Sequence, residues 1–395
     1  MWLTSLSLSN FRNITRQEIA LPRGTTLFVG SNAQGKTSVL EAIYYIATFA
    51  SFQTNTDSQL IRFDEQANNP AVARILADYE KGGQKHRLEV RVIVEANGGA
   101  APRTRKEVLL DGVKKSPADV IGAFTAVLFI PQMFSIMEAG PEVRRRYLNL
   151  TLAQTIPGYA RALSKYSKVL TQRNALLKAL AERGGDPAQL DYWNGQLIEI
   201  GSGLVYHRAR SLEKIESHAA GIHNNLSAGK EKLQFGYMPR LDHRQARIDP
   251  MAGCTLEDVR ERLQAGIKAC WQDELRRGIT LVGPHRDDLR ILDGGIDLGE
   301  FGSRGQLKTA LLSMKLAEYQ WMKEETQDSP VVLLDEVTSE IDVARRNALM
   351  RELGGYDQAL LTATDADTYS ADFISHSRVF QIANGQIINK QHPTT

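Results

Sequence analysis

The feature that most constrains the fold is the segment Gly30–Thr37, which reads G-x-x-x-x-G-K-T. The run 25–29 before it predicts a buried strand. The residues after it predict a helix, because apolar side chains recur at helical spacing: Leu40, Ile43, Tyr44 and Ala47. A strand, a glycine-rich loop and a helix in this order indicate a phosphate site, in which loop N–H groups and the helix N-terminus face the β-phosphate.

This loop predicts that the chain binds a nucleoside triphosphate, which we take to be ATP with Mg²⁺. Lys36 would add a point charge, and Thr37 would offer its hydroxyl to the metal. The residues expected to contact the nucleotide are the loop and its successor: Gly30, Ser31, Asn32, Ala33, Gln34, Gly35, Lys36, Thr37 and Ser38.

Charge and composition limit the kinds of partner. Lys and Arg number 48 against 46 Asp and Glu, a net charge of +2, so any DNA contact must come from local basic patches. Two cysteines, Cys254 and Cys270, indicate buried thiols in a reducing compartment rather than a disulfide framework. The first residues lack the pattern of a signal peptide, and 18 apolar residues never run together. We therefore expect a cytoplasmic protein with no membrane segment.

The spacing of apolar residues divides the chain into three parts. Residues 1–115 predict strands around one helix, the stretch 141–271 predicts helices, and strands return after Ile279. Local signals mark boundaries within these parts. Asp111-Gly112 and Asn384-Gly385 predict hairpin turns, and Thr255 predicts a helix N-cap.

A second candidate element of the nucleotide site lies far downstream. The apolar run 331–334 ends in Asp335 and Glu336. Asp335 would hold Mg²⁺, and Glu336 could polarise the water that attacks the γ-phosphate. Asp335 follows Lys36 by 299 positions, more than a compact nucleotide-binding core needs. We therefore expect a head assembled from residues 1–137 and 275–395, with residues 138–274 as an inserted helical domain.

Four stretches carry a resemblance to a known family: 8–13 (LSNFRN), 30–43 (GSNAQGKTSVLEAI), 283–289 (GPHRDDL) and 303–306 (SRGQ). Together they resemble the ABC-type ATPase heads of the SMC, Rad50 and RecF group, and most closely the RecF family of DNA recombination and repair. The resemblance implies an α/β, ABC-type P-loop ATPase head. Because no heptad pattern is sustained, we expect no long coiled coil.

The resemblance also assigns roles to residues outside the loop. In such heads a Ser-x-Gly-Gln segment opens a helix that caps the γ-phosphate bound by the other subunit, which implies a dimer formed with ATP. The corresponding residues are Ser303, Gly305 and Gln306, and Asp342 would face the opposite subunit. A simple helix start remains the alternative for Ser303 to Gln306.

Three further positions follow from the same resemblance. Arg12 would contact ATP, and Gln132 would sense the metal and the attacking water. Thr364 would sense phosphate, although an exposed turn threonine is the alternative. The chain departs from many family members at Glu336, Gln132 and Ser38, where Asp, Glu and Asn are frequent.

Two groups of basic residues are candidate DNA-binding surfaces, with a solvated charged face as the alternative for each. One surrounds the hairpin turn at 111–112, and the other opens a predicted helix: Arg103, Arg105, Lys106, Lys114, Lys115; Arg144, Arg145, Arg146. Few aromatic residues lie among them, so contact with the duplex backbone is expected. His285 and Arg286 are functional by resemblance, whereas a buried ion-pair network is the alternative for that motif.

The leading hypothesis is an ATP-dependent DNA-binding dimer, a slow ATPase that acts in repair and at replication forks on duplex or gapped DNA. The resemblance implies that it helps load a recombinase with mediators of the RecO/RecR type. Three alternatives stay open: an ATPase that energises a transporter, a P-loop kinase, and an SMC-like head of another DNA-processing or defence pathway.

Overall fold

The computed structural model describes residues 1–97, 100–227, 229, 231–242, 247–249, 251–336, 346, 349–350 and 352–389. The chain forms two compact units. Unit 1 consists of residues 1–132 and 318–395, and unit 2 of residues 133–317. Unit 1 therefore joins both chain ends, as the separation of Lys36 and Asp335 predicts. Unit 2 ends at residue 317 rather than 274, because β10 (Asp288–Asp293) pairs with β9 (Leu233–Met238) inside this unit.

The first sheet of unit 1 has six strands in the order β15-β14-β3-β13-β12-β8. Five of them run parallel, and β15 pairs antiparallel at the edge. Every residue of β8, β12 and β13 is buried, as expected for parallel strands covered on both faces. The strands span β3 (Gly24–Val29), β8 (Ala126–Phe129), β12 (Val331–Asp335), β13 (Gln358–Ala363), β14 (Ser377–Ala383) and β15 (Gln386–Asn389).

The second sheet of unit 1 is antiparallel, in the order β2-β1-β4-β5-β6-β7. In β4 buried residues alternate with partly exposed ones, which is typical of a sheet with one face on the core. The strands span β1 (Trp2–Phe11), β2 (Ile14–Ala20), β4 (Ala71–Lys81), β5 (Gln84–Asn97), β6 (Ala100–Leu110) and β7 (Val113–Lys115).

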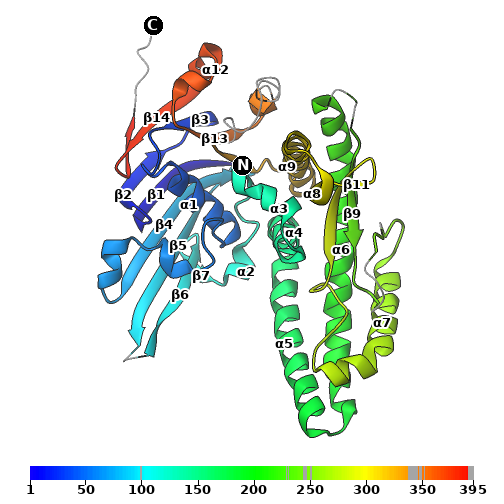
Figure 1. Cartoon of the computed structure of the whole chain (residues 1–395). Helices are drawn as coiled ribbons and strands as arrows, with labels where there is room; N and C mark the ends of the chain where they lie inside the picture. Colours follow the sequence, from blue (N-terminus) through cyan, green and yellow to red (C-terminus); the bar gives the residue numbers. More distant parts are fainter. Residues whose placement is uncertain are drawn as a thin grey trace. The chain divides into compact units, whose positions relative to one another are not determined.

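Helix α1 (Lys36–Thr48) is the central helix of unit 1. It contacts strands of both sheets, including β12 and β8 of the first and β1 and β4 of the second (Figure 1). Eleven of its thirteen residues are buried. The sequence indicated one apolar face, but a helix between two sheets is covered on nearly all sides. Short helical turns complete the unit: η1 (Asp57–Leu60), η2 (Phe63–Ala67), α2 (Pro117–Val120), η5 (Ala366–Thr368) and α12 (Ala371–Ser375).

Both predicted hairpin turns are confirmed. Asp111 and Gly112 have φ values of 52° and 79° and join β6 to β7. Asn384 and Gly385 have φ values of 52° and 71° and join β14 to β15. Two successive positive φ values are what a two-residue hairpin turn requires, and Asn, Asp and Gly reach them at low cost.

Unit 2 is mainly helical. Its long helices are α4 (Pro141–Thr155), α5 (Tyr159–Arg183), α6 (Asp191–Leu226) and α7 (Leu256–Arg277), with α5 and α6 antiparallel neighbours (Figure 1). Thr255 caps α7 as predicted, in a reciprocal capping box with Asp258. The sheet β11-β10-β9 and shorter segments complete it: η3 (Pro131–Phe134), α3 (Ser135–Glu138), η4 (Pro187–Leu190), β11 (Ile296–Asp297), α8 (Leu298–Phe301) and the start of α9 (Arg304–Thr326). Among the described residues, no helix has the length and apolar character to cross a bilayer.

Candidate functional site

The glycine-rich loop leaves the end of β3 and enters α1. Ala33 and Gly35 have φ values of 63° and 108°, so the loop uses the left-handed region twice before the helix begins. A Cβ atom at Gly30 would lie 2.3 Å from the carbonyl oxygen of Ile382, and only glycine fits there. These positions shape a loop whose N–H groups precede a helix N-terminus, the usual arrangement of a phosphate cradle.

The tip of the loop is held by the turn between β14 and β15. The backbone N–H of Asn384 donates to the Gln34 side-chain oxygen (2.6 Å), and that of Gly385 donates to the Gln34 carbonyl (3.0 Å). Asn13 lies on another side of the loop, where its Nδ2 donates to the Ala33 carbonyl (3.4 Å) and its Oδ1 accepts from the Ser38 hydroxyl (3.1 Å). The loop is therefore fixed by residues from both chain ends.

Lys36 is directed toward the loop and the acidic strand end. Its side chain is 3 % exposed, and Nζ donates to the carbonyls of Gly30 (2.7 Å) and Ser31 (3.1 Å). Nζ also lies 3.1 Å from Oε1 of Glu336. The predicted phosphate-binding lysine and the predicted water-polarising carboxylate thus meet, although 300 positions separate them in the chain.

Asp335 and Thr37 form the second contact between the chain ends. The Thr37 hydroxyl lies 3.0 and 2.9 Å from the two carboxylate oxygens of Asp335. Thr362 on β13 donates to Asp335 Oδ1 (2.7 Å) and accepts from the Glu336 N–H (3.0 Å). Burial raises the pKa of the Asp335 carboxyl above its usual value, the two threonine hydrogen bonds oppose the rise, and Glu336 adds to it.

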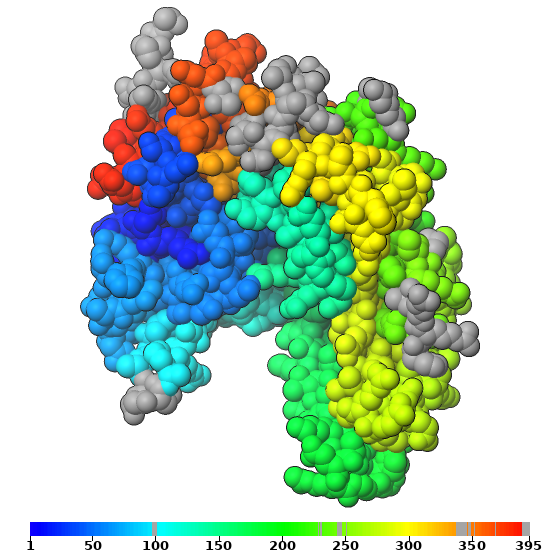
Figure 2. Space-filling model, viewed as in Figure 1, coloured from blue at the N-terminus to red at the C-terminus, as the bar shows by residue number. Residues whose placement is uncertain are grey.

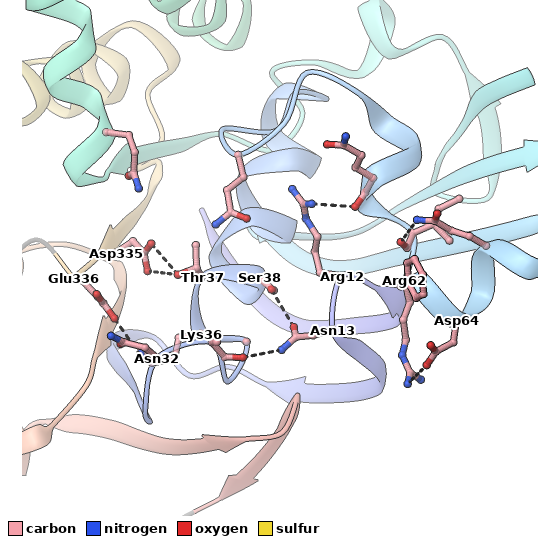
Figure 3. Close-up of a pocket in the computed structure, with 18 of the residues that line it drawn as sticks. Arg12, Asn13, Asn32, Lys36, Thr37, Ser38, Arg62, Asp64, Asp335 and Glu336 are labelled. Atoms are coloured by element: carbon pink, nitrogen blue, oxygen red, sulfur yellow. Dashed lines mark hydrogen bonds and ion pairs between the residues drawn. The ribbon is translucent and has the colours of Figure 1, made fainter. Parts of the chain in front are cut away.

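These groups line one cavity of about 860 Å³ in unit 1, shown in Figure 3. Predicted residues on its wall are Arg12, Asn32, Ala33, Gly35, Lys36, Thr37, Ser38, Gln132, Asp335 and Glu336. The other lining residues were not predicted to contact the nucleotide, although Asn13 belongs to the stretch 8–13: Asn13, Gln53, Gln59, Ile61, Arg62, Phe63, Asp64, Gln66 and Pro131. Phe63 is 83 % exposed, the largest exposed fraction of any large apolar side chain described.

Arg12 reaches the cavity from the end of β1. Its Nε and Nη2 atoms donate to the two carboxylate oxygens of Glu41 (2.7 and 2.6 Å), and Nη1 donates to the Gln59 carbonyl (2.9 Å). The Glu41 side chain is fully buried on α1. This bidentate pair fixes the cavity wall to the helix that follows the phosphate loop.

Gly30, Ser31 and Gln34 belong to the predicted nucleotide contacts but are not among the residues that line the cavity. Thr364 is exposed after β13 and is not among the residues that line the cavity, whereas Thr362, which the sequence did not single out, contacts Asp335. Asp342 lies outside the described residues. Their predicted roles remain predictions.

Ser303 and Gln306 open α9. The Ser303 N–H donates to the Gln306 side-chain oxygen (3.0 Å), and the Gln306 N–H donates to the Ser303 hydroxyl (3.3 Å). This is a capping box at an exposed helix N-terminus, and Gly305 occupies its first turn. The geometry fits a helix start and leaves the N-terminus accessible to an anion.

Most of the predicted DNA-binding cations of the β6–β7 hairpin are paired with carboxylates. Three of its five predicted DNA-binding cations form ion pairs at 2.6–3.0 Å: Arg105 with Glu95 and Glu107, Lys106 with Asp57, and Lys114 with Glu107. Arg103 and Lys115 are exposed. Because nearby carboxylates neutralise most of the positive charge of this hairpin, the structure gives little support to the prediction that it binds DNA.

The prediction that Arg144 lies on a DNA-binding surface is wrong. Its side chain is buried and donates to both carboxylate oxygens of Asp288 (2.7 and 3.0 Å). Arg145 is half-buried and donates to the Asp287 carbonyl (2.7 Å), whereas Arg146 is exposed. At least Arg144 therefore serves the interior of unit 2.

The motif at 283–289 is the centre of that interior network. Asp287 accepts from Arg208 Nη1 (2.7 Å), the Tyr237 hydroxyl (2.6 Å) and the Arg240 N–H (2.8 Å). His285 Nδ1 lies 2.8 Å from the Tyr166 hydroxyl, and burial lowers the pKa of His285 to about 4. A buried ion-pair network, the alternative for this motif, is what the structure contains.

Comparisons with known proteins agree with this architecture. The family model "RecF/RecN/SMC N terminal domain" matches residues 2–387. The "DNA replication and repair protein RecF" of Chloroflexus aurantiacus is 40 % identical over 98 % of this chain and 99 % of its own length. The protein of the same name from Herpetosiphon aurantiacus is 35 % identical over 98 % and 99 %.

Solved structures give the same result. One described as the "recombination mediator protein RecF-ATP in RecFOR pathway" superimposes with a TM-score of 0.84 at 29 % identity, covering 99 % of this chain and 98 % of that one. The Smc head domain from Pyrococcus furiosus matches at a TM-score of 0.53 and 16 % identity, over 99 % and 96 % of the two chains, which supports the fold alone.

The fold and the cavity define a P-loop ATPase head of the ABC type, built from both chain ends around an inserted helical unit. The chain belongs to the RecF family, within the wider RecF/RecN/SMC group.

Proposed function

We propose that this chain is an ATP-dependent DNA-binding protein of recombinational repair and replication-fork maintenance. ATP joins two copies, the dimer binds duplex or gapped DNA and helps load a recombinase, and slow, DNA-stimulated hydrolysis releases it. The observation that carries the proposal is the cavity where the phosphate loop meets Asp335 and Glu336, in a chain whose relatives are named for DNA replication and repair.

The residues of the cavity fit ATP. The close approach of Gly30 to Ile382 and the positive φ of Gly35 shape a loop suited to phosphates, with Lys36 as the cation. From this end the cavity runs past Arg12 and Asn13 toward Arg62 and Asp64 (Figure 3). With the phosphates at Lys36, the base would lie at the far end, beside Phe63.

The oxygen atoms near Thr37 fit Mg²⁺. One hydroxyl and one carboxylate within 3.0 Å of each other, with Gln132 on the same cavity wall, form a hard donor set. Mg²⁺ commonly uses one or two such protein ligands and completes its shell with water and phosphate oxygens. The metal would neutralise negative charge on the triphosphate.

Glu336 is the group we assign to water activation. In the structure its carboxylate pairs with Lys36 at 3.1 Å, so each neutralises the other. A triphosphate on Lys36 would compete for this cation and free the Glu336 carboxylate as a base. Substitution by Gln keeps the size of the side chain but replaces one acceptor oxygen with an amide NH2 group, which cannot act as a base.

The proposed dimer depends on the N-terminus of α9. Its first turn, with Ser303 and Gly305, would cap the γ-phosphate held by the other copy, as in related heads, and Asp342 would face that copy. Proteins of the RecO/RecR type would act with the dimer in loading recombinase. The similar RecF structure is described as part of the RecFOR pathway, which supports this choice of partners.

The decisive experiment measures binding to duplex and to gapped DNA, with and without ATP, together with the molecular mass in solution. Wild type is compared with Lys36→Ala and Glu336→Gln. We expect wild type to dimerise and bind DNA only with ATP, and Lys36→Ala to lose both responses. Glu336→Gln should form a long-lived ATP dimer on DNA. A wild type that stays monomeric with ATP and ignores DNA would disprove the proposal.

A further inference from the structure

A long segment of unit 2 contains basic residues and no acidic ones. The whole chain has 46 Asp and Glu among 395 residues, yet none occurs from Val143 to Ala181. Eight basic residues lie in this segment: Arg144, Arg145, Arg146, Arg161, Lys165, Lys168, Arg173 and Lys178. In a chain of net charge +2, such a segment concentrates positive charge on α4 and α5.

Three of these cations have a structural role. Arg144 pairs with Asp288, and Arg173 Nη2 lies 2.6 Å from Oε2 of Glu274 with both side chains fully buried. The half-buried Arg145 donates to the Asp287 carbonyl. The remaining cations of α5 are exposed.

The exposed residues within 161–172 of α5 form a stripe, which we define as Arg161, Ser164, Lys165, Ser167, Lys168, Thr171 and Gln172. Arg161, Lys165, Lys168 and Gln172 follow one another at intervals of four, three and four residues, which places them on one side of the helix. All seven side chains are exposed and able to donate hydrogen bonds, and none carries a carboxylate. Figure 2 shows α5 (green) on the surface of unit 2.

Helix α6, one of the helices that contact α5, offers little negative charge to the stripe. Arg173 bonds to Asn194 and Arg208 bonds to Tyr159, so residues 194–206 of α6 run alongside it. The only carboxylate within residues 194–206 is Glu199. Glu199 already pairs with Arg260 of α7 at 2.8 Å. This differs from the hairpin β6–β7, where most cations pair with local carboxylates.

We propose that the stripe on α5 binds the phosphate backbone of duplex DNA. The inference rests on the proposed DNA-binding function and adds the surface that performs it. Lys and Arg neutralise phosphates, and Ser, Thr and Gln donate to phosphate oxygens without reading sequence. The stripe contains no aromatic side chain, so base stacking is not its mode. It extends about 17 Å along the helix axis, enough for several phosphates of one strand.

The test uses the double variant Lys165→Ala/Lys168→Ala in the full chain. Alanine keeps the helix, so folding and ATP binding should match wild type. With ATP, duplex affinity at 0.1 M salt should fall about tenfold, and the slope of log affinity against log salt should become shallower by about two. Lys165→Arg/Lys168→Arg should restore both values.

The matched control is Arg210→Ala/Arg276→Ala, which also removes two exposed cations from unit 2. Each of these is already paired with an acidic residue three positions away, Glu213 and Asp273. We expect it to bind DNA with the wild-type slope. An equal loss of duplex affinity in both double variants would mean that only the net charge of the protein matters. That result would overturn the proposal that the stripe binds DNA.

Two other outcomes distinguish a failure of the proposed DNA-binding surface from a failure of the proposed function. If wild type binds duplex DNA and Lys165→Ala/Lys168→Ala keeps the same affinity and salt slope, the stripe is not the contact surface and the proposed function stands. If wild type binds no duplex with ATP even at low salt, the proposed function and this surface fail together.

Discussion

The nucleotide cavity of unit 1 and the network around residues 283–289 of unit 2 are both built from charged side chains, yet they use them differently. In unit 2, Asp287 has three partners within 2.8 Å, and Arg208 and Asp287 are almost completely buried. In unit 1, Lys36 and Glu336 meet on the wall of an open cavity. In unit 2 the buried Asp287 carboxylate is already hydrogen-bonded to protein donors. In unit 1, Lys36 can exchange its ion pair with Glu336 for an ion pair with a phosphate.

This difference shows why a motif typical of a family need not be a ligand site. The phosphate loop and GPHRDDL both support the resemblance to the RecF group. The phosphate loop lines an open cavity, whereas Asp287 of GPHRDDL is enclosed by its own partners. We expect substitutions in the unit 2 network to change stability, and substitutions in the cavity to change ligand binding.

The largest effect is expected for Arg208→Ala. Removing this cation leaves the buried Asp287 carboxylate without its charge partner, which costs about 3–5 kcal/mol in the free energy of unfolding. Urea unfolding measures the change, with Arg210→Ala as the control, since that exposed cation should cost under about 0.5 kcal/mol. A loss below about 1 kcal/mol for Arg208→Ala would break the comparison.

His285 should make stability depend on pH. Its folded pKa of about 4 lies below the unfolded value of about 6.5, so between these values only the unfolded chain binds the proton. The free energy of unfolding should therefore fall as pH falls through this window, by up to about 3 kcal/mol, and His285→Gln should remove this part of the slope. Unfolding curves from pH 7 to 4 measure it; identical slopes for both proteins would contradict the assignment.

Phe63→Ala should act on binding alone. Its ring is 83 % exposed, so the free energy of unfolding should hardly change, but loss of the surface beside the base should weaken ATP binding about tenfold. Titration calorimetry with ATP and with inorganic tripolyphosphate separates the two ends of the cavity. An equal loss for both ligands would place the base elsewhere.

The smallest effect is expected for Asp335→Asn without nucleotide. Because burial raises the pKa of this carboxyl, its ionised form costs stability at neutral pH, and the neutral amide should raise Tm by about 2–4 °C. The same variant should lose the additional stabilisation that Mg²⁺ gives in the presence of ATP. Thermal scans with and without Mg·ATP provide both readouts, and a lower Tm without nucleotide would show that the carboxylate stabilises unit 1.

Several parts of this molecule could be predicted from local sequence. Gly30–Thr37, the turns at 111–112 and 384–385, and the N-cap Thr255 depend on backbone conformations that few residues tolerate, so residue type reveals them. The acidic strand end at Asp335 was found in the same way, through an apolar run that stops at a carboxylate. The family resemblance added the split head.

Features set by distant neighbours could not be predicted. Arg12 with Glu41, Thr362 with Asp335, and the cavity wall at 61–64 depend on how strands pair across the chain. The buried position of Arg144 could not be predicted because its partner, Asp288, is 144 positions away. The sequence shows a segment of α5 without acidic residues, but which of its cations form the stripe depends on their exposure, which only the structure gives.

The hydrogen bonds between the β14–β15 turn and the phosphate loop also determine when the nucleotide site can form during translation. Gln34 leaves the ribosome 350 residues before Asn384 and Gly385, which hold it, and Asp335 also follows late. At about 5–20 residues per second, this interval lasts roughly 20–70 s. A nascent chain therefore cannot complete its nucleotide site until residue 385 has been synthesised. Fragments left by stalled ribosomes would carry the loop sequence without the part that holds it.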